Sequence, residues 1–232
     1  MRRISAVAVA WRAFIFLALG APASAQMAPA ADELQAYRDL HAAAAKGDGP
    51  GIERLVAAKV AIDSRDGHGR TPLHVAAFLR KPDAAQTLLR LGADPNALEA
   101  QKYDIVTIAA VANDVAMLKL ALAGGGSAKN VTSPYDGTAL IAAAHLGHDE
   151  VVRTLIAAKA PLDHVNNLGW TALIESIVLG DGGERHIAVL EALVKAGANV
   201  NITDRAGRTP LALARGRGYT AMARILEQAG GR

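Results

Sequence analysis

Apolar and polar residues follow a pattern along this chain that repeats about every 33 residues. Each period holds two stretches with apolar residues at helical spacing, such as Leu88, Leu89 and Leu91, and Gly92 then ends that helix at low conformational cost. The first helix of each period carries a small residue, at Ala43, Ala76, Ala109, Ala143, Ser176 and Ala214. The pattern predicts helix-turn-helix units that bury their apolar faces only by stacking on their neighbours.

The residues within each period resemble those of the ankyrin repeat family. Residues 66–77 read DGHGRTPLHVAA, residues 146–163 read LGHDEVVRTLIAAKAPLD, and residues 207–214 read GRTPLALA. A period of about 33 residues and the Thr-Pro-Leu-His signature are typical of that family. The resemblance covers residues 34–229 and implies an all-α ankyrin-repeat solenoid of about six helix-turn-helix units joined by β-hairpin-like fingers.

Six repeats are expected, near residues 34–65, 66–98, 99–130, 133–165, 166–201 and 204–230. The first lacks the Thr-Pro-Leu signature and carries polar residues on its helices, as a terminal cap does. The third is degenerate, with Asp104-Ile105-Val106-Thr107 in place of the signature. The fifth holds an insertion of about five residues around 181–185, which predicts a longer loop between its two helices.

Residues 1–25 have the features of a cleavable secretory signal. Arg2 and Arg3 precede an apolar stretch, and Ala23-Ser24-Ala25 provides small residues before the expected cleavage at Gln26. Arg12 leaves the apolar run shorter than the ~20 residues of a membrane-spanning helix. We therefore predict a signal peptide at 1–25, a linker at 26–33, no membrane anchor after cleavage and a periplasmic location, with secretion as the alternative.

Charge and cysteine content exclude several functional classes. The whole chain carries a formal charge of +3, but removal of residues 1–25 leaves 22 basic and 22 acidic residues. No basic stripe is present, so nucleic acid is not an expected partner. The absence of cysteine excludes disulfides, thiolate metal sites and a cysteine nucleophile.

Seven histidines require that a metal or catalytic site be considered. The family resemblance implies local structural roles for His74 in its signature and for His148 in its Gly-His pair. Gly147 separates His145 from His148, which argues against a shared helical face and a convergent ligand set. Paired carboxylates, a nucleophile elbow and a phosphate-binding loop are also missing. We therefore expect no metal, no cofactor and no catalytic residues.

Ankyrin proteins bind partners with their finger tips and with the exposed side of their first helices, which line a concave groove. The resemblance implies that the partner-binding residues are His68, Arg70, Phe78, Leu79, Tyr103, Tyr135, His145, Leu168, Trp170, Arg205 and Arg208. Aromatic residues with flanking arginines are typical of interface hot spots. The alternative is that Tyr103 and Trp170 only pack against their own fingers.

The sequence thus predicts an exported, non-catalytic and monomeric module that binds another protein through the concave face of repeats two to five. Its role would be that of an adaptor, protector or inhibitor of an envelope protein. One alternative is a secreted effector that binds a host protein, and another is a metal- or small-molecule-binding enzyme on a repeat scaffold. The partner itself is not identified, because framework residues encode the stack and few surface positions encode specificity.

Overall fold

A computed structural model describes residues 26–232, and the predicted signal peptide at residues 1–25 lies outside them. The described residues form thirteen α-helices, and their only β pairing is an isolated bridge between Thr132 and Gly137. This confirms the predicted all-α class. The helices are α2 (Ala31–Ala36), α3 (Asp39–Lys46), α4 (Gly49–Ala57), α5 (Pro72–Phe78), α6 (Pro82–Arg90), α7 (Ile105–Val111), α8 (Val115–Ala123), α9 (Ala139–His145), α10 (Asp149–Ala157), α11 (Ala172–Val178), α12 (Glu184–Lys195), α13 (Pro210–Gly216) and α14 (Thr220–Gln228).

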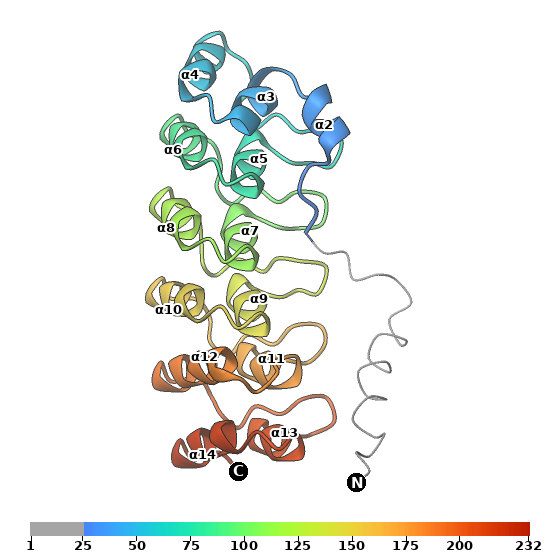
Figure 1. The fold of residues 1–232 in the computed structure, drawn as a ribbon, viewed down its shortest axis with the longest axis vertical. Helices are drawn as coiled ribbons and strands as arrows, with labels where there is room; N and C mark the ends of the chain where they lie inside the picture. Colours follow the sequence, from blue (N-terminus) through green and yellow to red (C-terminus); the bar gives the residue numbers. More distant parts are fainter. Residues whose placement is uncertain (1–25) are drawn as a thin grey trace, which may run out of the picture.

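From α3 onward the helices stack as six antiparallel pairs in two columns (Figure 1). The odd-numbered helices form the inner column, the even-numbered helices form the outer column, and the long loops between pairs project on one side. One apolar core runs through the whole stack. The small residues of the inner helices are all buried, which allows each helix to approach the next closely: Ala43, Ala76, Ala109, Ala143, Ser176 and Ala214.

A side-chain cap begins each inner helix from α5 onward. Thr71, Thr138, Thr171 and Thr209 each accept a hydrogen bond from a backbone N–H three residues later. In the degenerate third repeat, Asp104 takes this position and accepts from the Thr107 N–H at 2.8 Å. The cap is therefore kept where the Thr-Pro-Leu signature is lost, because a carboxylate satisfies the same free N–H group.

Five loops between pairs end in tight turns, which we call finger 2 (residues 66–70), finger 3 (99–103), finger 4 (133–137), finger 5 (166–170) and finger 6 (204–208). The first residue of each finger accepts hydrogen bonds from the backbone N–H groups two and four residues later, at 2.9–3.4 Å. A carboxylate, hydroxyl or amide oxygen serves equally well, and the five acceptors are Asp66, Glu99, Ser133, Asn166 and Asp204.

The insertion in the fifth repeat changes more than the predicted loop. Residues 179–183 connect α11 to α12, whereas residues 79–81 connect α5 to α6. Helix α12 has 12 residues, and the other outer helices have 9. The additional residues are thus divided between the loop and the helix.

The segment expected as a linker, residues 26–33, already contains the start of helix α2 at Ala31. The Ala30 N–H donates to Glu33 Oε2 at 2.6 Å and so closes the first turn of this helix. Pro29 is buried, and Tyr37, directly after α2, packs against the core. Helix α2 lies beside α3 on the side where the fingers project (Figure 1), so this segment is part of the folded domain.

Candidate functional site

The fingers are joined to one another along the stack by backbone hydrogen bonds. The Ala100 N–H donates to His68 O at 3.0 Å, and the Asn167 N–H donates to Tyr135 O at 2.9 Å. Finger 4 is joined to finger 3 in the same way through the Lys102 carbonyl. Finger 6 is held to finger 5 by a side chain, since the Arg205 guanidinium donates to Asn167 O. The fingers therefore form one continuous surface.

Three large apolar side chains are exposed where the chain enters consecutive fingers. Leu98 is 36% exposed, Val131 is 49% exposed and Val165 is 44% exposed. They are three of only five exposed large apolar residues among those the structure describes. They are not among the partner-binding residues predicted from the sequence, although their intervals of 33 and 34 residues match the repeat period. Each of them lies eight residues after the end of an outer helix (α6, α8 or α10), so they recur on one side of the stack, and we call them the apolar row.

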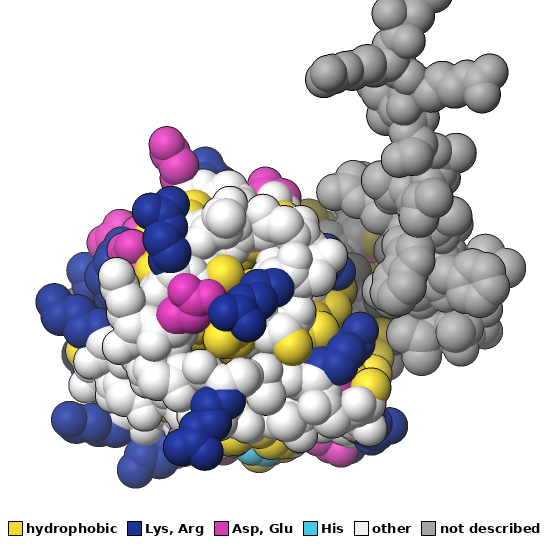
Figure 2. Space-filling view, turned by 90° about the horizontal axis from the view of Figure 1, so that it is seen from below, with side chains coloured by type: hydrophobic (Ala, Val, Ile, Leu, Met, Phe, Trp, Pro, Cys, Tyr) yellow, Lys and Arg dark blue, Asp and Glu magenta, His cyan; other side chains and the backbone are white. Residues whose placement is uncertain are grey.

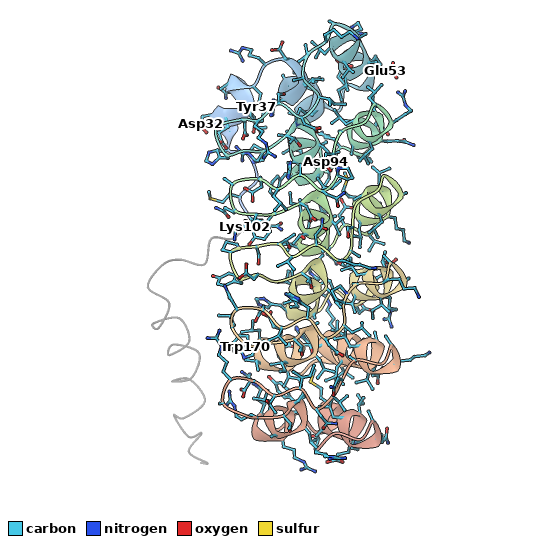
Figure 3. The ribbon with its side chains drawn as sticks, turned by 180° about the vertical axis from the view of Figure 1, so that it is seen from behind. Asp32, Tyr37, Glu53, Asp94, Lys102 and Trp170 are labelled. Carbon is cyan, nitrogen blue, oxygen red and sulfur yellow. The ribbon has the colours of Figure 1, made fainter. Side chains whose placement is uncertain are left out.

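The predicted aromatic row is only partly available to a partner. Tyr103 is 7% exposed and belongs to the core, so, contrary to the prediction, little of its side chain is open to a partner. Tyr135, Leu168 and Trp170 are half-buried. Figure 3 shows Trp170 on the side of the stack where the fingers project, close to the edge of the ribbon.

The inner helices contribute a second set of predicted residues. Phe78 and Leu79 are half-buried and pack against the core, so only part of each side chain is open to a partner. His145 is exposed at the end of α9, and Leu146, which follows it, is 39% exposed. Among the predicted residues of the inner helices, the exposed one is therefore in repeat four and not in repeat two.

A buried carboxylate lies in α11 next to His145. Glu175 is 5% exposed and occupies a position that is apolar in the neighbouring inner helices. Asn166 Nδ2 donates to Glu175 Oε1 at 2.7 Å, and His145 Nδ1 lies 3.7 Å from Glu175 Oε2. Burial raises the pKa of Glu175 to about 7, against the opposing effect of the Asn166 hydrogen bond. Burial, together with the nearby His186 and His148, lowers the pKa of His145.

Arg70 is not part of the free surface, which corrects the sequence prediction. It is 2% exposed, and its guanidinium donates to Asp66 Oδ2 at 2.7 Å and to Glu33 Oε1 at 2.5 Å. Tyr37 donates its hydroxyl proton to the same Asp66 oxygen at 2.7 Å. His68 keeps half of its side chain exposed but lies 2.8 Å from Glu33. The segment that contains α2 therefore covers finger 2.

At the other end of the stack the predicted arginines remain accessible. Arg205 is exposed, and the Arg208 side chain is 49% exposed. Arg208 pairs with Asp204, which is nearly buried beneath it. Burial acts to raise the pKa of Asp204, but the hydrogen bonds from the Arg208 backbone and side chain outweigh it and lower that pKa.

His74 has the local structural role that the resemblance implied. Its Nδ1 accepts a hydrogen bond from the Thr71 N–H at 3.1 Å, so Nε2 carries the proton and donates to Tyr103 O at 3.1 Å. Burial lowers the pKa of His74 to about 4, which keeps the ring neutral. Among residues 26–232, no three acidic or histidine side chains converge as a metal site would require.

Comparisons with known proteins agree with the repeat pattern. A family model for ankyrin repeats (three copies) matches residues 27–99 and 106–204. The ankyrin repeat protein YahD of Escherichia coli is 33% identical over 193 residues, which cover 83% of this chain and 96% of YahD. An ankyrin repeat domain of Acinetobacter baumannii is 44% identical with a TM-score of 0.80, over 83% of this chain and 98% of that one. The ankyrin repeat protein EF0377 is 29% identical with a TM-score of 0.76, again over 83% and 98%.

Proposed function

This chain belongs to the ankyrin-repeat family, and on that premise we propose that it is an exported protein-binding module whose partner is a protein of the cell envelope. It binds this partner through the fingers and inner helices of repeats three to five. Repeat two contributes less, because α2 and the residues before it cover finger 2. The module is non-catalytic and acts by protecting, inhibiting or connecting its partner.

The apolar row carries this proposal. Leu98, Val131 and Val165 expose apolar surface to water at equivalent places in three repeats, which stabilises nothing within the chain itself. Exposed apolar residues that recur on one side of a repeat stack are suited to burial against another protein. Fingers 4 and 5 also hold half-buried Tyr135 and Trp170. Aromatic side chains of this kind contribute strongly when a partner buries them.

Support for export comes from the sequence of residues 1–25. Basic residues, an apolar stretch and a small-residue cleavage motif follow one another in the order of a secretory signal. Within the described residues no helix is both long and apolar enough to cross a membrane. A binding module with this signal would meet its partner in the envelope.

Support for a binding role over a catalytic one comes from the surroundings of Glu175. This carboxyl has a strongly perturbed pKa, as catalytic groups often do. Its polar side-chain neighbours are Asn166 and His145, and no group of three acidic or histidine side chains that could hold a metal ion is found among the described residues. Buried polar pairs of this kind also occur as structural elements.

A crosslinked pull-down from the organism's own envelope extract tests the proposal. The bait is protein spanning residues 26–232, and its binding-surface variant combines Leu98→Ser, Val131→Ser and Val165→Ser. The control variant combines Glu53→Ser, Lys119→Ser and Glu191→Ser, three exposed residues of the outer helices α4, α8 and α12. All three proteins are first compared by circular dichroism for equal helicity.

The proposal expects one envelope protein that the unmodified bait and the outer-helix control capture and that the apolar-row variant loses. Equal capture by all three proteins would show that the partner does not bind at the apolar row. Failure to capture any envelope protein would contradict the envelope partner. Cell fractionation with an antibody to the chain tests export separately, and a protein that stays in the cytoplasm at full length would overturn that part.

A further inference from the structure

Fingers 2 and 6 share the motif Asp-x-x-Gly-Arg-Thr-Pro-Leu, at residues 66–73 and 204–211. In both, the first aspartate accepts two backbone N–H groups through Oδ1 at 2.9 Å. In both, Oδ2 accepts from the arginine Nε, at 2.7 Å in finger 2 and 2.8 Å in finger 6. The two fingers thus hold Arg70 and Arg208 in the same way.

Finger 2 is occupied by a carboxylate from elsewhere in the chain. Glu33 of α2 accepts from the Arg70 NH2 group and lies 2.8 Å from His68 Nε2. The Met27 carbonyl accepts from the Arg70 NH1 group at 3.4 Å. A short acidic helix is therefore the natural occupant of this finger geometry, and its docking leaves only 3% of the Arg70 side chain exposed.

Finger 6 has no such occupant among the described residues. Within residues 26–232, Asp204 is the only hydrogen-bond or ion-pair partner of the Arg208 guanidinium, and 49% of the side chain is exposed. Both Nε and NH2 of Arg208 lie within 2.8 Å of the same oxygen, Asp204 Oδ2. At finger 2 the corresponding NH2 group instead donates to Glu33. The outer edge of the Arg208 guanidinium is therefore free for a second carboxylate.

The charge around finger 6 favours an acidic occupant. Residues 204–232 hold six arginines and only two acidic residues, Asp204 and Glu227. Figure 2 looks onto the end formed by α13 and α14 and shows basic side chains spread over it, with fewer acidic ones between them. Basic side chains gathered on one face attract an acidic segment and fix its orientation.

We propose that finger 6 binds an acidic segment of a partner protein, with a Glu or Asp carboxylate paired to the outer edge of the Arg208 guanidinium and taking the part that Glu33 has at Arg70. Arginine suits this role because its planar guanidinium presents donors to two carboxylates at once. The chain's own α2 is engaged at finger 2, so the segment comes from another protein. Ala206 stands where finger 2 has His68, so finger 6 offers one donor fewer and binds more weakly. This site rests on the proposed protein-binding function and gives its partner a chemical character.

The probe is a fluorescent peptide of residues 26–38, QMAPAADELQAYR, and its partner is protein spanning residues 26–232. A second peptide carries Glu33→Gln. The protein variants are Arg208→Gln, Arg208→Lys and the matched control Arg224→Gln, which removes one exposed charge from the same repeat. Anisotropy gives the affinity, and NMR shifts of the arginine Nε–H groups and of the Ala206 and Gly207 amides locate the peptide.

We expect saturable binding at finger 6 that Arg208→Gln and the Glu33→Gln peptide each weaken by about tenfold, the loss of one charge-assisted pair. Arg208→Lys should weaken it by less, and Arg224→Gln by less than about twofold. Unchanged affinity in Arg208→Gln, shifts confined to Arg70 of finger 2, or no shifts at finger 6 with millimolar peptide would each overturn the proposal. If the pull-down finds its partner while finger 6 ignores the peptide, only this site fails. If finger 6 binds the peptide but no partner is captured, the proposed function fails.

Discussion

The two ends of the stack carry the same finger motif in opposite surroundings. At the N-terminal end, Arg70 is 2% exposed and pairs with two carboxylates, Asp66 and Glu33. At the C-terminal end, Arg208 has half of its side chain in water and pairs with Asp204 alone. The motif determines how the turn closes on its aspartate. Whether the arginine becomes part of the interior depends on α2, which packs on one end only.

The contrast between the two ends shows on which charges the stability of the fold depends. A buried ion pair gives little net stability when intact, but removing one partner leaves an uncompensated buried charge. An exposed pair contributes little in either case, because water and salt screen it. The same substitution at the two ends should therefore have different consequences. The predictions below test that difference, from the largest effect to the smallest.

Substituting each arginine by alanine tests the comparison directly. Arg70→Ala leaves the Asp66 and Glu33 carboxylates facing each other, so we expect it to lower the free energy of unfolding by about 3 kcal/mol. Arg208→Ala should lower it by less than about 1 kcal/mol. Urea unfolding followed by circular dichroism at pH 7 measures both losses. An unchanged dependence of the unfolding free energy on urea concentration checks that the variants unfold from the same compact state. Equal losses would show that α2 does not change the surroundings of its finger.

Glu175→Gln tests a buried ionisable group that lacks such pairing. Arg70 pairs with two carboxylates, whereas Glu175 accepts a hydrogen bond from the neutral amide of Asn166. The folded pKa is about 7 and the unfolded pKa is 4.5, so between these values the unfolded chain loses its proton while the folded chain keeps it. Stability must then fall as the pH rises through this window. We expect the glutamine variant to be more stable than the natural chain by about 2 kcal/mol at pH 8 and no more stable near pH 4. Urea unfolding over pH 4–8 checks this, and a loss of stability at pH 8 would contradict it.

The loss of folding stability at acidic pH should also differ between the two ends. Burial acts to raise the pKa of Asp66, but hydrogen bonds from Tyr37, Arg70 and the finger backbone lower it from 3.8 to about 2. The stability that ionised Asp66 contributes is present above its unfolded pKa and is lost as the pH falls from about 4 to 2. Between pH 4 and pH 2, Asp66→Asn should reduce the decrease in unfolding free energy by about 1.5 kcal/mol, and Asp204→Asn should reduce it by less than half as much. Unfolding at pH 2, 3 and 4 measures the two slopes, and equal slopes would count against the burial difference.

Removing one hydroxyl from the N-terminal network should have the smallest effect. Tyr37→Phe removes a hydrogen bond to the charged Asp66 oxygen and should cost about 1 kcal/mol. Tyr219→Phe is the matched control, because its hydroxyl donates to the neutral Gly180 carbonyl at 3.0 Å. We expect about half the effect there. The urea concentration at the unfolding midpoint of each variant measures the two losses of stability. A larger loss in Tyr219→Phe than in Tyr37→Phe would contradict the prediction.

Much of the fold could be predicted from the sequence, because its determinants are local and repeat with the period. The helix caps, the small residues of the inner helices and the role of His74 each depend on neighbours within a few positions or at the same place in the next repeat. The candidate site was predicted less well. Tyr103 proved to be buried, and the exposed residues Leu98, Val131 and Val165 were missed, although they recur at the repeat period.

Local sequence patterns account for the all-helical repeat, the order of its helices and the geometry of each finger turn. Those features follow from hydrogen bonds and apolar contacts between residues that are close in the chain or related by the period. Which copies of a motif face water depends instead on the packing of segments that are distant in the chain. Arg70 and Arg208 have nearly the same local sequence, and their exposure differs because Glu33, 37 residues before Arg70, folds back onto one of them. Burial depends on everything that packs against a residue, and a local pattern does not contain that information.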